Sequence, residues 1–247
     1  DGWSCGQASG VGYNFTYEIN AARGVPGDIS GNQYSTHYTW NFYNEGRHDL
    51  GVSYYHSFEL IRSAGHPDKE DFGEGINYLS WMNGYDKYYN AMHNRLDGVY
   101  SIFVASEEGI LNLKHWINDH MNGSQVGGVA SFYSETQNNT PTVLLPEGTP
   151  EAGKHAVTAF GPYAGHAMTI VGYNDSIRYD YNNDGIYTNH LDINEDGLVD
   201  LRDREIGGFL FANSFGNQWA DSGFCYVMYN AFAGKKPVDG IWNQRVH

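Results

Sequence analysis

Apolar residues recur at helical spacing in the first half of this 247-residue chain. In the segment from Val11 to Arg23 they lie three or four residues apart, and the pattern stops at Gly24. This spacing predicts a helix over residues 11–23, because residues three and four apart share one helix face. The same criteria predict three further helices, at residues 34–44, 53–64 and 107–121.

The second half changes character from about residue 127 onward. Short runs rich in Val, Ile, Phe and Tyr predict β-strands there. These runs cover residues 128–133, 166–173, 209–213 and 224–229. Helices followed by strands indicate an α+β protein with two lobes and a cleft between them. We expect a single domain over residues 1–247, with a mainly helical lobe over about 1–122 and a mainly β lobe over about 123–247.

One segment between two of the predicted strands is strongly acidic. Residues 175–205 contain nine acidic side chains against three arginines. Because an apolar core does not accept that density of charge, we expect this segment to be an exposed insertion.

The charge balance argues against nucleic acid as a partner. Acidic residues outnumber Lys and Arg by 29 to 14, and the basic residues form no stripe that could neutralise phosphates. The chain has no run of eighteen apolar residues, so we expect a soluble protein without a membrane span. No signal peptide opens the sequence, and its abrupt start at Asp1 is compatible with a leader or prosegment that was removed or left out.

Three side chains have the chemistry of a cysteine-dependent acyl-transfer enzyme. Such an enzyme needs a thiolate, a histidine that shares its proton, a group that orients the histidine, and donors for the oxyanion. Cys5 opens a helix, where the positive end of the helix dipole stabilises a thiolate. His166 begins one predicted strand and Asn213 ends another. Taken singly, a cysteine or a histidine in such a place is more often a packing residue.

The sequences around the histidine and the asparagine resemble the papain-like cysteine peptidase family. The run G-H-A-M-T-I-V-G-Y around His166 is similar to the histidine motif of that family. The run N-S-F-G-N-Q-W-A-D-S-G-F from Asn213 resembles its asparagine motif, N-S-W-G-x-x-W-G-x-x-G-Y. The resemblance implies a papain-like two-lobed fold, a triad of Cys5, His166 and Asn213, and Trp219 as part of the wall of the substrate site.

Other positions match that family less closely. Phe215 replaces the first Trp of the asparagine motif, which shields the hydrogen bond between asparagine and histidine from water, and Ala220 replaces a Gly. Residues 33–37 resemble the S-x-Q segment that follows the family's first helix. Gly51 matches one residue of a Gly pair that binds the substrate backbone, whereas Val52 stands at the second position.

The nucleophile position has two alignments. The family motif is Q-G-x-C-G-S-C-W-A-F, in which the second Cys attacks, and this chain reads W-S-C-G-Q-A-S from Trp3. Matching Cys-Gly to Cys-Gly places Ala8 at the nucleophile position and describes an inactive protein. Matching Ser-Cys to the final Ser-Cys makes Cys5 the nucleophile, and we favour this alignment because the other two motifs are intact. In both alignments the oxyanion-hole Gln of the family falls at or before the start of this sequence.

The second cysteine, Cys225, lies on the last predicted strand, where we interpret it as a packed thiol. With two cysteines in the chain, a bridge between Cys5 and Cys225 is the sole disulfide available. Such a bridge would contradict the assignment of Cys5 as the nucleophile. The cysteine count leaves the compartment open.

The acidic insertion contains two calcium-loop patterns. Residues 192–203 match D-x-[DN]-x-[DN]-G, with oxygen side chains at loop positions 1, 3, 5, 9 and 12, Gly at 6 and a backbone carbonyl at 7. The ligands expected in this second loop are Asp192, Asn194, Asp196, Leu198, Asp200 and Asp203. Asp rather than Glu at position 12 resembles a dockerin loop.

Residues 180–186 repeat the first half of this pattern. The ligands expected in this first loop are Asp180, Asn182, Asp184 and, through its carbonyl, Ile186. Position 12 is Leu191, and Asp192, one residue further on, is a candidate for sharing between the loops. His166 and Asn213 are 47 residues apart, more than the papain-like pattern usually has. We expect Ca²⁺ bound in this insertion to hold the two triad strands in register.

Together these patterns predict a secreted, Ca²⁺-stabilised, papain-like cysteine peptidase that acts on proteins or peptides. Millimolar Ca²⁺ outside cells favours an extracellular or cell-surface location. Two alternatives stay open: an inactive papain-fold protein that binds peptide or glycan, and another Cys-dependent acyl-transfer enzyme, such as an amidase or a transglutaminase-like protein. A reactive thiol at Cys5 would separate the enzymes from the binding protein.

Overall fold

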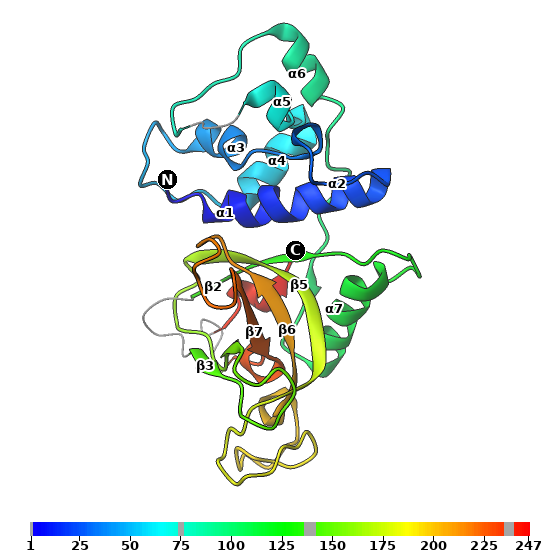
Figure 1. Ribbon diagram of the computed structural model, residues 1–247, viewed down its shortest axis with the longest axis vertical. Helices are drawn as coiled ribbons and strands as arrows, with labels where there is room; N and C mark the ends of the chain where they lie inside the picture. Colours follow the sequence, from blue (N-terminus) through cyan, green and yellow to red (C-terminus); the bar gives the residue numbers. More distant parts are fainter. Residues whose placement is uncertain (1, 74–76, 136–141, 235–239) are drawn as a thin grey trace. The chain divides into compact units, whose positions relative to one another are not determined.

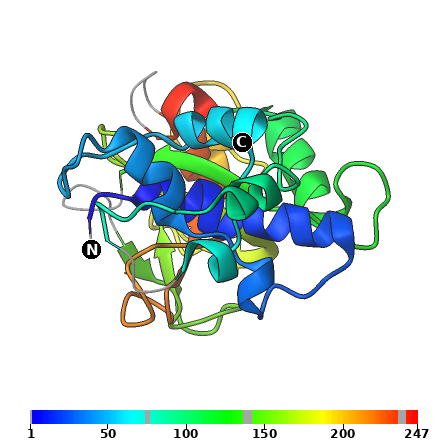
Figure 2. The ribbon, with the colours of Figure 1, turned by 90° about the horizontal axis from the view of Figure 1, so that it is seen from above.

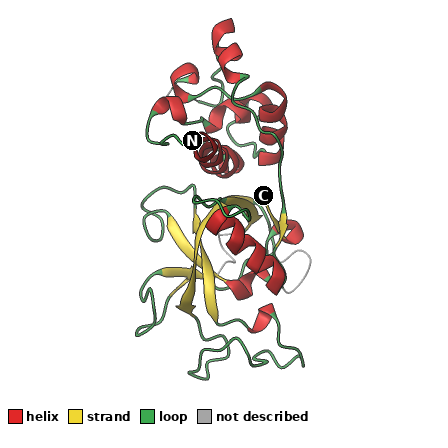
Figure 3. Cartoon of the chain, turned by 90° about the vertical axis from the view of Figure 1, so that its right-hand side faces the viewer, coloured by secondary structure: helices red, strands yellow, loops and turns green. Residues whose placement is uncertain are grey.

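The protein, in a computed structural model, folds into two compact units (Figure 1). The structure describes residues 2–73, 77–135, 142–234 and 240–247. Residues 1–100 form the first unit, which is mainly helical, and residues 101–247 form the second, which contains the main β-sheet (Figure 3). The α+β class predicted from the order of the apolar patterns is confirmed. Across the described ranges, we find no helix with both the length and the apolar character needed to span a bilayer.

One continuous helical run crosses the first unit. It consists of α1 (Cys5–Gln7), a π-helical segment η1 (Ala8–Phe15) and α2 (Thr16–Arg23), drawn in dark blue in Figures 1 and 2. Gly24 ends the run with a left-handed φ of 66°, a conformation that Gly adopts without steric cost. The end of the helix was therefore predicted from the sequence.

The apolar spacing places the start of this helix too late, at Val11, whereas the placing of Cys5 at the opening of a helix agrees with the structure. Glycines interrupt the first turns, and Gly is a poor helix former, so neither periodicity nor propensity indicates the true start. The reason for one of these glycines is tertiary: a Cβ at Gly10 would lie 2.5 Å from the Cβ of Tyr54. Gly10 lets η1 pack directly on helix α4 (Tyr54–Ala64).

The remaining described helices of the first unit lie on one side of this run (Figure 1). They are η2 (Ser30–Asn32), α3 (Thr36–Tyr43), α4, α5 (Lys69–Phe72) and α6 (Tyr85–Ala91). Ser35 and Ser53 cap α3 and α4, each accepting a backbone N–H from two positions further on at 3.3 Å. The helices predicted at residues 34–44 and 53–64 are confirmed within one or two residues at each end.

A buried histidine lies among the aromatic rings of the first unit. His66 has no exposed surface, and its ring centroid lies 4.8 to 6.0 Å from those of Phe15, Tyr34 and Tyr38. Its Nδ1 lies 2.7 Å from the carbonyl oxygen of Pro67, so Nδ1 carries the proton of the neutral ring. Burial lowers the pKa of His66 from 6.5 to about 4, because the core disfavours the charged imidazolium.

This shift predicts that the protein loses stability as the pH falls from 6.5 towards 4. In that window the unfolded chain binds a proton that folded His66 does not, so the free energy of unfolding decreases, by on the order of 3 kcal/mol at the limit. We expect a His66→Phe variant to have a urea midpoint that changes less with pH across the window. If the urea midpoint of the variant changes with pH as steeply as that of the wild type, His66 is not the group responsible for the loss of stability.

The second unit is built on a sheet that has six strands within the described residues. In sheet order these are β2 (Ala130–Ser134), β5 (His166–Arg178), β6 (Ile206–Ala212), β7 (Phe224–Met228), β4 (His155–Val157) and β3 (Thr142–Leu144). Neighbours are antiparallel except β4 and β7, which are parallel. Two further strands, β1 (Ile102–Phe103) and β8 (Arg245–Val246), pair separately. The four strands predicted from the sequence are confirmed, whereas β3 and β4 are too short to give a periodic pattern.

Helix α7 (Glu107–Asp119) lies in the second unit, although its sequence was counted with the helical lobe. Its residues Ile110, Leu113 and Ile117 are buried in one cluster with Met168 of β5. An apolar helix face does not by itself indicate which partner it covers. The contacts therefore set the boundary between the units near residue 100 rather than near residue 122.

The acidic segment begins as strand, because β5 extends to Arg178. Beyond it, residues 179–205 form loops and the single turn η3 (Leu201–Asp203). Most of these side chains are exposed or half-buried, but Asp203 and Glu205 have no exposed surface. The expectation of a wholly exposed insertion is wrong at these two residues, since backbone N–H groups satisfy their carboxylates in the interior.

Candidate active site

The pairing of β5 with β6 brings His166 and Asn213 together. His166 is the first residue of β5, and Asn213 follows Ala212, the last residue of β6. Because antiparallel neighbours run in opposite directions, the start of one and the end of the other lie at the same end of the sheet. The acidic segment joins the opposite ends of these strands, in yellow in Figure 1, so its length does not separate the two side chains.

A hydrogen bond joins the two side chains: Nε2 of His166 lies 2.7 Å from Oδ1 of Asn213. The same oxygen accepts the backbone N–H of Ser214 at 2.7 Å. Since an N–H group can only donate, this second contact fixes the orientation of the Asn213 amide and makes Nε2 of His166 the donor. The lone pair of the neutral imidazole is therefore on Nδ1, and Nδ1 is the atom that can take a proton.

Phe215 covers the imidazole of His166. The two ring centroids are 4.6 Å apart with an interplanar angle of 23°, a stacked arrangement. Burial lowers the pKa of His166 below its usual value, and the hydrogen bond that Nε2 donates to Asn213 partly offsets this by raising the pKa. Phe215 thus covers one face of the imidazole, and the burial of the ring favours its neutral form.

The loop between β6 and β7, which carries Phe215, is held in place by two contacts. The ring of Trp219 meets that of Phe215 edge-on, with centroids 6.1 Å apart, and packs partly buried against the core. Asp221 accepts hydrogen bonds from the backbone N–H and from Nδ1 of His155, at 2.8 and 3.1 Å. Ala220, which replaces a Gly of the family motif, has a φ of 44°, a conformation that Gly would adopt at lower cost.

In the first unit, Cys5 is the first residue of the helical run, with Ser4 as its N-cap. Cys5 is partly exposed. The N–H groups of the first helical turn lack intrahelical partners and favour a negative charge nearby. Ala8, the nucleophile position of the alternative alignment, lies about one turn further on, within η1. The residue at the start of the helical run is therefore Cys5, and the alternative alignment places the nucleophile position at Ala8, inside the run.

Both cysteines are free thiols, so the structure does not contain the one disulfide that the sequence allows. Cys225 on β7 has no exposed surface, and burial raises its pKa to about 12. A thiol in that state stays protonated and inert at neutral pH. Its place in the core agrees with the interpretation of Cys225 as a packing residue.

The structure places Gly51 beside the segment that leads into Cys5. A Cβ at Gly51 would lie 3.9 Å from the carbonyl oxygen of Trp3, two residues before the thiol. The indole N–H of Trp40 donates to the carbonyl of Leu50 at 3.0 Å and so fixes the backbone in front of Gly51. Gly51 is exposed, and its backbone is accessible to a ligand next to the start of the helical run.

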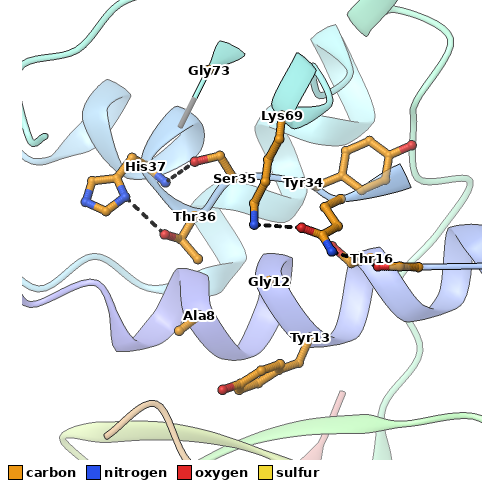
Figure 4. Close-up of a pocket in the computed structure, with 12 residues that line it drawn as sticks. Ala8, Gly12, Tyr13, Thr16, Tyr34, Ser35, Thr36, His37, Lys69 and Gly73 are labelled. Atoms are coloured by element: carbon orange, nitrogen blue, oxygen red, sulfur yellow. Dashed lines mark hydrogen bonds between the residues drawn. The ribbon is translucent and has the colours of Figure 1, made fainter. Parts of the chain in front are cut away.

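A pocket of about 740 Å³ lies along the same helical run (Figure 4). All the residues that line it belong to the first unit, and they come from the helical run, from residues 27–37 and from residues 69–73. Ala8 lines the pocket and Cys5 does not. Inside it, Nζ of Lys69 donates to Oε1 of Gln33 at 2.9 Å. The sequence analysis did not predict this pocket, because its walls come from separate segments.

The second calcium-loop pattern folds around the carboxylate of Asp192. The two oxygens of this carboxylate accept the backbone N–H groups of Asp196 and Gly197, at 3.2 and 2.8 Å. Asp203 closes the loop, because its Oδ1 accepts the N–H of Ile193, loop position 2, at 3.0 Å. Positions 1, 2, 5, 6 and 12 of the pattern are thus connected by hydrogen bonds.

The first calcium-loop pattern folds in the same way around Asp180. Its carboxylate accepts the backbone N–H groups of Asp184 and Gly185, at 3.2 and 2.9 Å. The closing carboxylate is that of Glu205, whose Oε1 accepts the N–H of Tyr181, loop position 2, at 2.9 Å. Glu205 therefore occupies in the first loop the role that Asp203 has in the second.

Sequence reasoning missed Glu205 because it lies outside the twelve-residue window of the first loop, in which Leu191 holds position 12. Its second oxygen accepts the N–H of Thr188 at 3.0 Å. The available signal was the spacing of two acidic residues, Asp203 and Glu205, directly before the apolar strand β6. Alternate residues before a strand point to one face, so both carboxylates can turn inward.

The oxygen side chains of the loops fit the ligand preference of Ca²⁺, which binds carboxylate, amide and carbonyl oxygens. Arg202 holds two of them, with nitrogens 2.6 Å from an oxygen of Asp196 and 2.5 Å from an oxygen of Asp200. In the parts of the chain that the structure describes, no three His, Cys, Asp or Glu side chains are gathered as a metal site. In the second loop, a cation bound to these oxygens would compete with Arg202 for Asp196 and Asp200.

Comparison with solved structures gives the fold. The chain is similar to xylellain, a cysteine protease from Xylella fastidiosa, with a TM-score of 0.53, 14% identity and coverage of 98% of this chain and 76% of the other. Bromelain from Ananas comosus gives a TM-score of 0.51 at 12% identity, with coverage of 92% of this chain and 80% of the other. The ragweed pollen cysteine protease Amb a 11 in its proform gives a TM-score of 0.52 at 14% identity, with coverage of 94% of this chain and 56% of the other. No protein-family model and no curated protein matches the chain.

These similarities show that the chain has the papain-like fold that its motifs implied. The helical first unit and the sheet of the second unit are both included, because each match covers more than nine-tenths of this chain. The chain spans little more than half of the ragweed proform. At 12 to 14% identity the comparison establishes architecture, and the chemistry rests on the residues described above.

Proposed function

We propose that this chain is a cysteine peptidase that hydrolyses peptide bonds with Cys5, His166 and Asn213. The observation that carries the proposal is the bond between His166 and Asn213, which leaves the lone pair of the imidazole on Nδ1. Cys5 supplies a partly exposed thiol at the start of a helical run, whereas Cys225 is buried. Similarity of fold to two cysteine proteases, xylellain and bromelain, supports the same assignment.

In the proposed reaction, Nδ1 of His166 takes the proton of the Cys5 thiol, and the sulfur forms a bond to the scissile carbonyl carbon. The carbon–nitrogen bond then breaks, and the imidazolium gives its proton to the leaving amine. Water attacks the resulting thioester with His166 as the base, which releases the carboxylic acid and regenerates the thiol. The backbone N–H of Cys5, the first of the helical run, is a candidate donor to the oxyanion.

Three further residues contribute to substrate binding in this proposal. Gly51 has an exposed backbone without a side chain, so an extended peptide can approach its N–H and C=O groups closely. Trp219 and Phe215 present aromatic surface next to His166, and 40% of the Phe215 side chain is exposed. Aromatic surface of this kind suits the apolar side chains of a peptide.

The test is the hydrolysis of a peptide library by the purified chain, with Cys5→Ser as the matched control. We expect mass spectrometry to detect cleaved peptides with the wild type and none with the variant. Absence of cleavage together with an unreactive Cys5 would replace the peptidase with the inactive binding protein. Release of ammonia or transfer to an amine, without chain cleavage, would replace it with the amidase or transglutaminase-like alternative.

Calcium binding in the acidic segment is a second part of the proposal. The residues that would hold Ca²⁺ in the first loop are Asp180, Asn182, Asp184, the carbonyl of Ile186, and Glu205. Those of the second loop are Asp192, Asn194, Asp196, the carbonyl of Leu198, Asp200 and Asp203. Because the two loops join β5 to β6, cations there would stabilise the strand pair that carries the histidine and the asparagine.

An extracellular location and a removable prosegment complete the proposal. Millimolar Ca²⁺ is available outside cells and would saturate loops of extracellular affinity. The ragweed protease in the comparison was solved as a proform, which supports a prosegment here. The substrate would be a protein or a peptide.

A further inference from the structure

Gln7 is a buried polar side chain that the proposed reaction does not use. It lies two residues after Cys5, at the end of α1, and has no exposed surface. Its Nε2 lies 3.1 Å from the carbonyl oxygen of Val52 and 3.4 Å from that of Ser53. A third contact, of 3.0 Å, joins Nε2 to Oγ of Ser57 in α4.

The partners of this amide decide its orientation. Backbone carbonyl oxygens only accept hydrogen bonds, so the nitrogen of the Gln7 amide must face Val52 and Ser53. The other end, Oε1, is buried and accepts no hydrogen bond from any described residue. Burying an acceptor without a partner costs free energy, whereas the contacts of Nε2 with Val52, Ser53 and Ser57 stabilise this conformation of Gln7.

The amide connects two segments that the proposed function needs to hold at a fixed spacing. On one side is the start of the helical run, which carries Cys5. On the other is the segment with Gly51 and Val52, which leads into the Ser53 cap of α4. Hydrogen bonds from Gln7 to two successive carbonyls of that segment fix both its distance and its direction.

We propose that Gln7 is a positioning residue, which holds the Cys5 thiol in register with the backbone of Gly51 so that a bound peptide presents its carbonyl carbon to the sulfur. This inference rests on the proposed function of Cys5 as the nucleophile. The Val52 carbonyl is turned inward to Gln7, and 8% of Val52 is exposed, which leaves Gly51 as the exposed neighbour in this segment.

The test compares Gln7→Leu with the wild type in steady-state hydrolysis of a peptide. Loss of the register displaces the sulfur from the carbonyl carbon, and displacements of about 1 Å cost on the order of 10²-fold in rate. We expect kcat to fall by about 10- to 100-fold and KM to change less, because the substrate still binds but is poorly aligned. Ser57→Ala removes one acceptor, keeps the two carbonyl contacts, and should lower kcat by a few-fold.

Asn44→Leu is the matched control. Asn44 is also a buried amide of the first unit, 1% exposed, and its Nδ2 donates to the carbonyl of Tyr78 at 2.8 Å. Within the described part of the chain its side chain contacts Asn41, Gly46 and Tyr78 and not Gln7 or Cys5, so its loss should lower the urea midpoint while the folded protein keeps its kcat. If Gln7→Leu also lowers the midpoint and leaves kcat unchanged, Gln7 is structural and the inference is wrong. A wild type without Cys5-dependent hydrolysis would overturn the proposed function and, with it, this inference.

Gln7→Glu gives a readout that a purely structural role does not predict. The carboxylate would face two carbonyl oxygens and repel them, whereas the protonated acid can donate one hydrogen bond to them. We expect the ratio of kcat of the variant to kcat of the wild type to rise on acidification, at pH values where both proteins are fully folded. A ratio that does not depend on pH would contradict the positioning role.

Discussion

The His166→Ala variant is expected to lose about 10³-fold or more in kcat/KM for a peptide substrate. In the proposed reaction Nδ1 of His166 takes the thiol proton and later protonates the leaving amine. The hydrogen bond of 2.7 Å to Asn213 fixes the tautomer that this requires, and removing the imidazole removes the group proposed for both proton transfers. Steady-state kinetics across a range of pH measure the loss, which should appear in kcat because both proton transfers belong to the chemical step.

Two further variants define what this result means. His190→Ala removes an exposed histidine of the acidic segment and should retain the activity of the wild type. Asn213→Ala should have a smaller effect, about 10- to 100-fold, because the base is kept but is no longer oriented. The hydrogen bond that His166 donates to Asn213 raises the pKa of His166, so its loss in this variant should move the acidic limb of the rate profile to lower pH. An active His166→Ala protein would show that the pair has no catalytic role.

The Glu205→Gln variant is expected to unfold at a lower temperature than the wild type. The buried carboxylate accepts N–H groups from Tyr181 and Thr188 with its two oxygens. An amide can accept at one oxygen only, so one buried donor loses its partner, at a cost of about 1–3 kcal/mol. For a chain of this size each kcal/mol corresponds to roughly 2–4 °C in Tm, which thermal unfolding in EGTA detects.

Calcium should raise the Tm of the wild type, and the closing carboxylates should determine by how much. A free Ca²⁺ concentration of 100 times Kd adds about 2.7 kcal/mol per site. Glu205→Gln should lose the part of the Ca²⁺-dependent rise in Tm that comes from the first loop, and Asp203→Asn should lose the part that comes from the second. Glu108→Gln, an exposed carboxylate of α7, should leave the rise in Tm unchanged. If EGTA and Ca²⁺ give the wild type the same Tm, the calcium proposal fails and the fold assignment is unaffected.

The sequence predicts well those helices and strands whose buried side chains recur at a regular spacing along the chain. The strand pair β5 and β6 and the helices α3 and α4 were predicted from apolar spacing and caps. The start of the first helix was not, because Gly10 is required by its contact with Tyr54, which is distant in sequence. Tertiary packing decides such a position, and the local pattern cannot indicate it.

The same division holds for the candidate site. The partnership of His166 and Asn213 could be predicted, because their motifs are local and the strands that carry them are antiparallel neighbours. The role of Glu205 could not be predicted, since it depends on how the acidic segment folds back so that Glu205 meets the backbone of Tyr181. Gln7 gave no signal either, because a buried amide is identified by its partners and not by its neighbours in sequence.

The most direct test of the central claim is the rate at which iodoacetamide alkylates Cys5 at mildly acidic pH, followed by mass spectrometry of the modified peptide. If Cys5 and His166 act as a pair, the wild type reacts faster than a free thiol and the His166→Ala variant reacts at the rate of a free thiol or more slowly. Cys225, fully buried, should stay unmodified in both proteins. Equal rates at Cys5 in the wild type and the variant would contradict the claim that the two residues form one catalytic site.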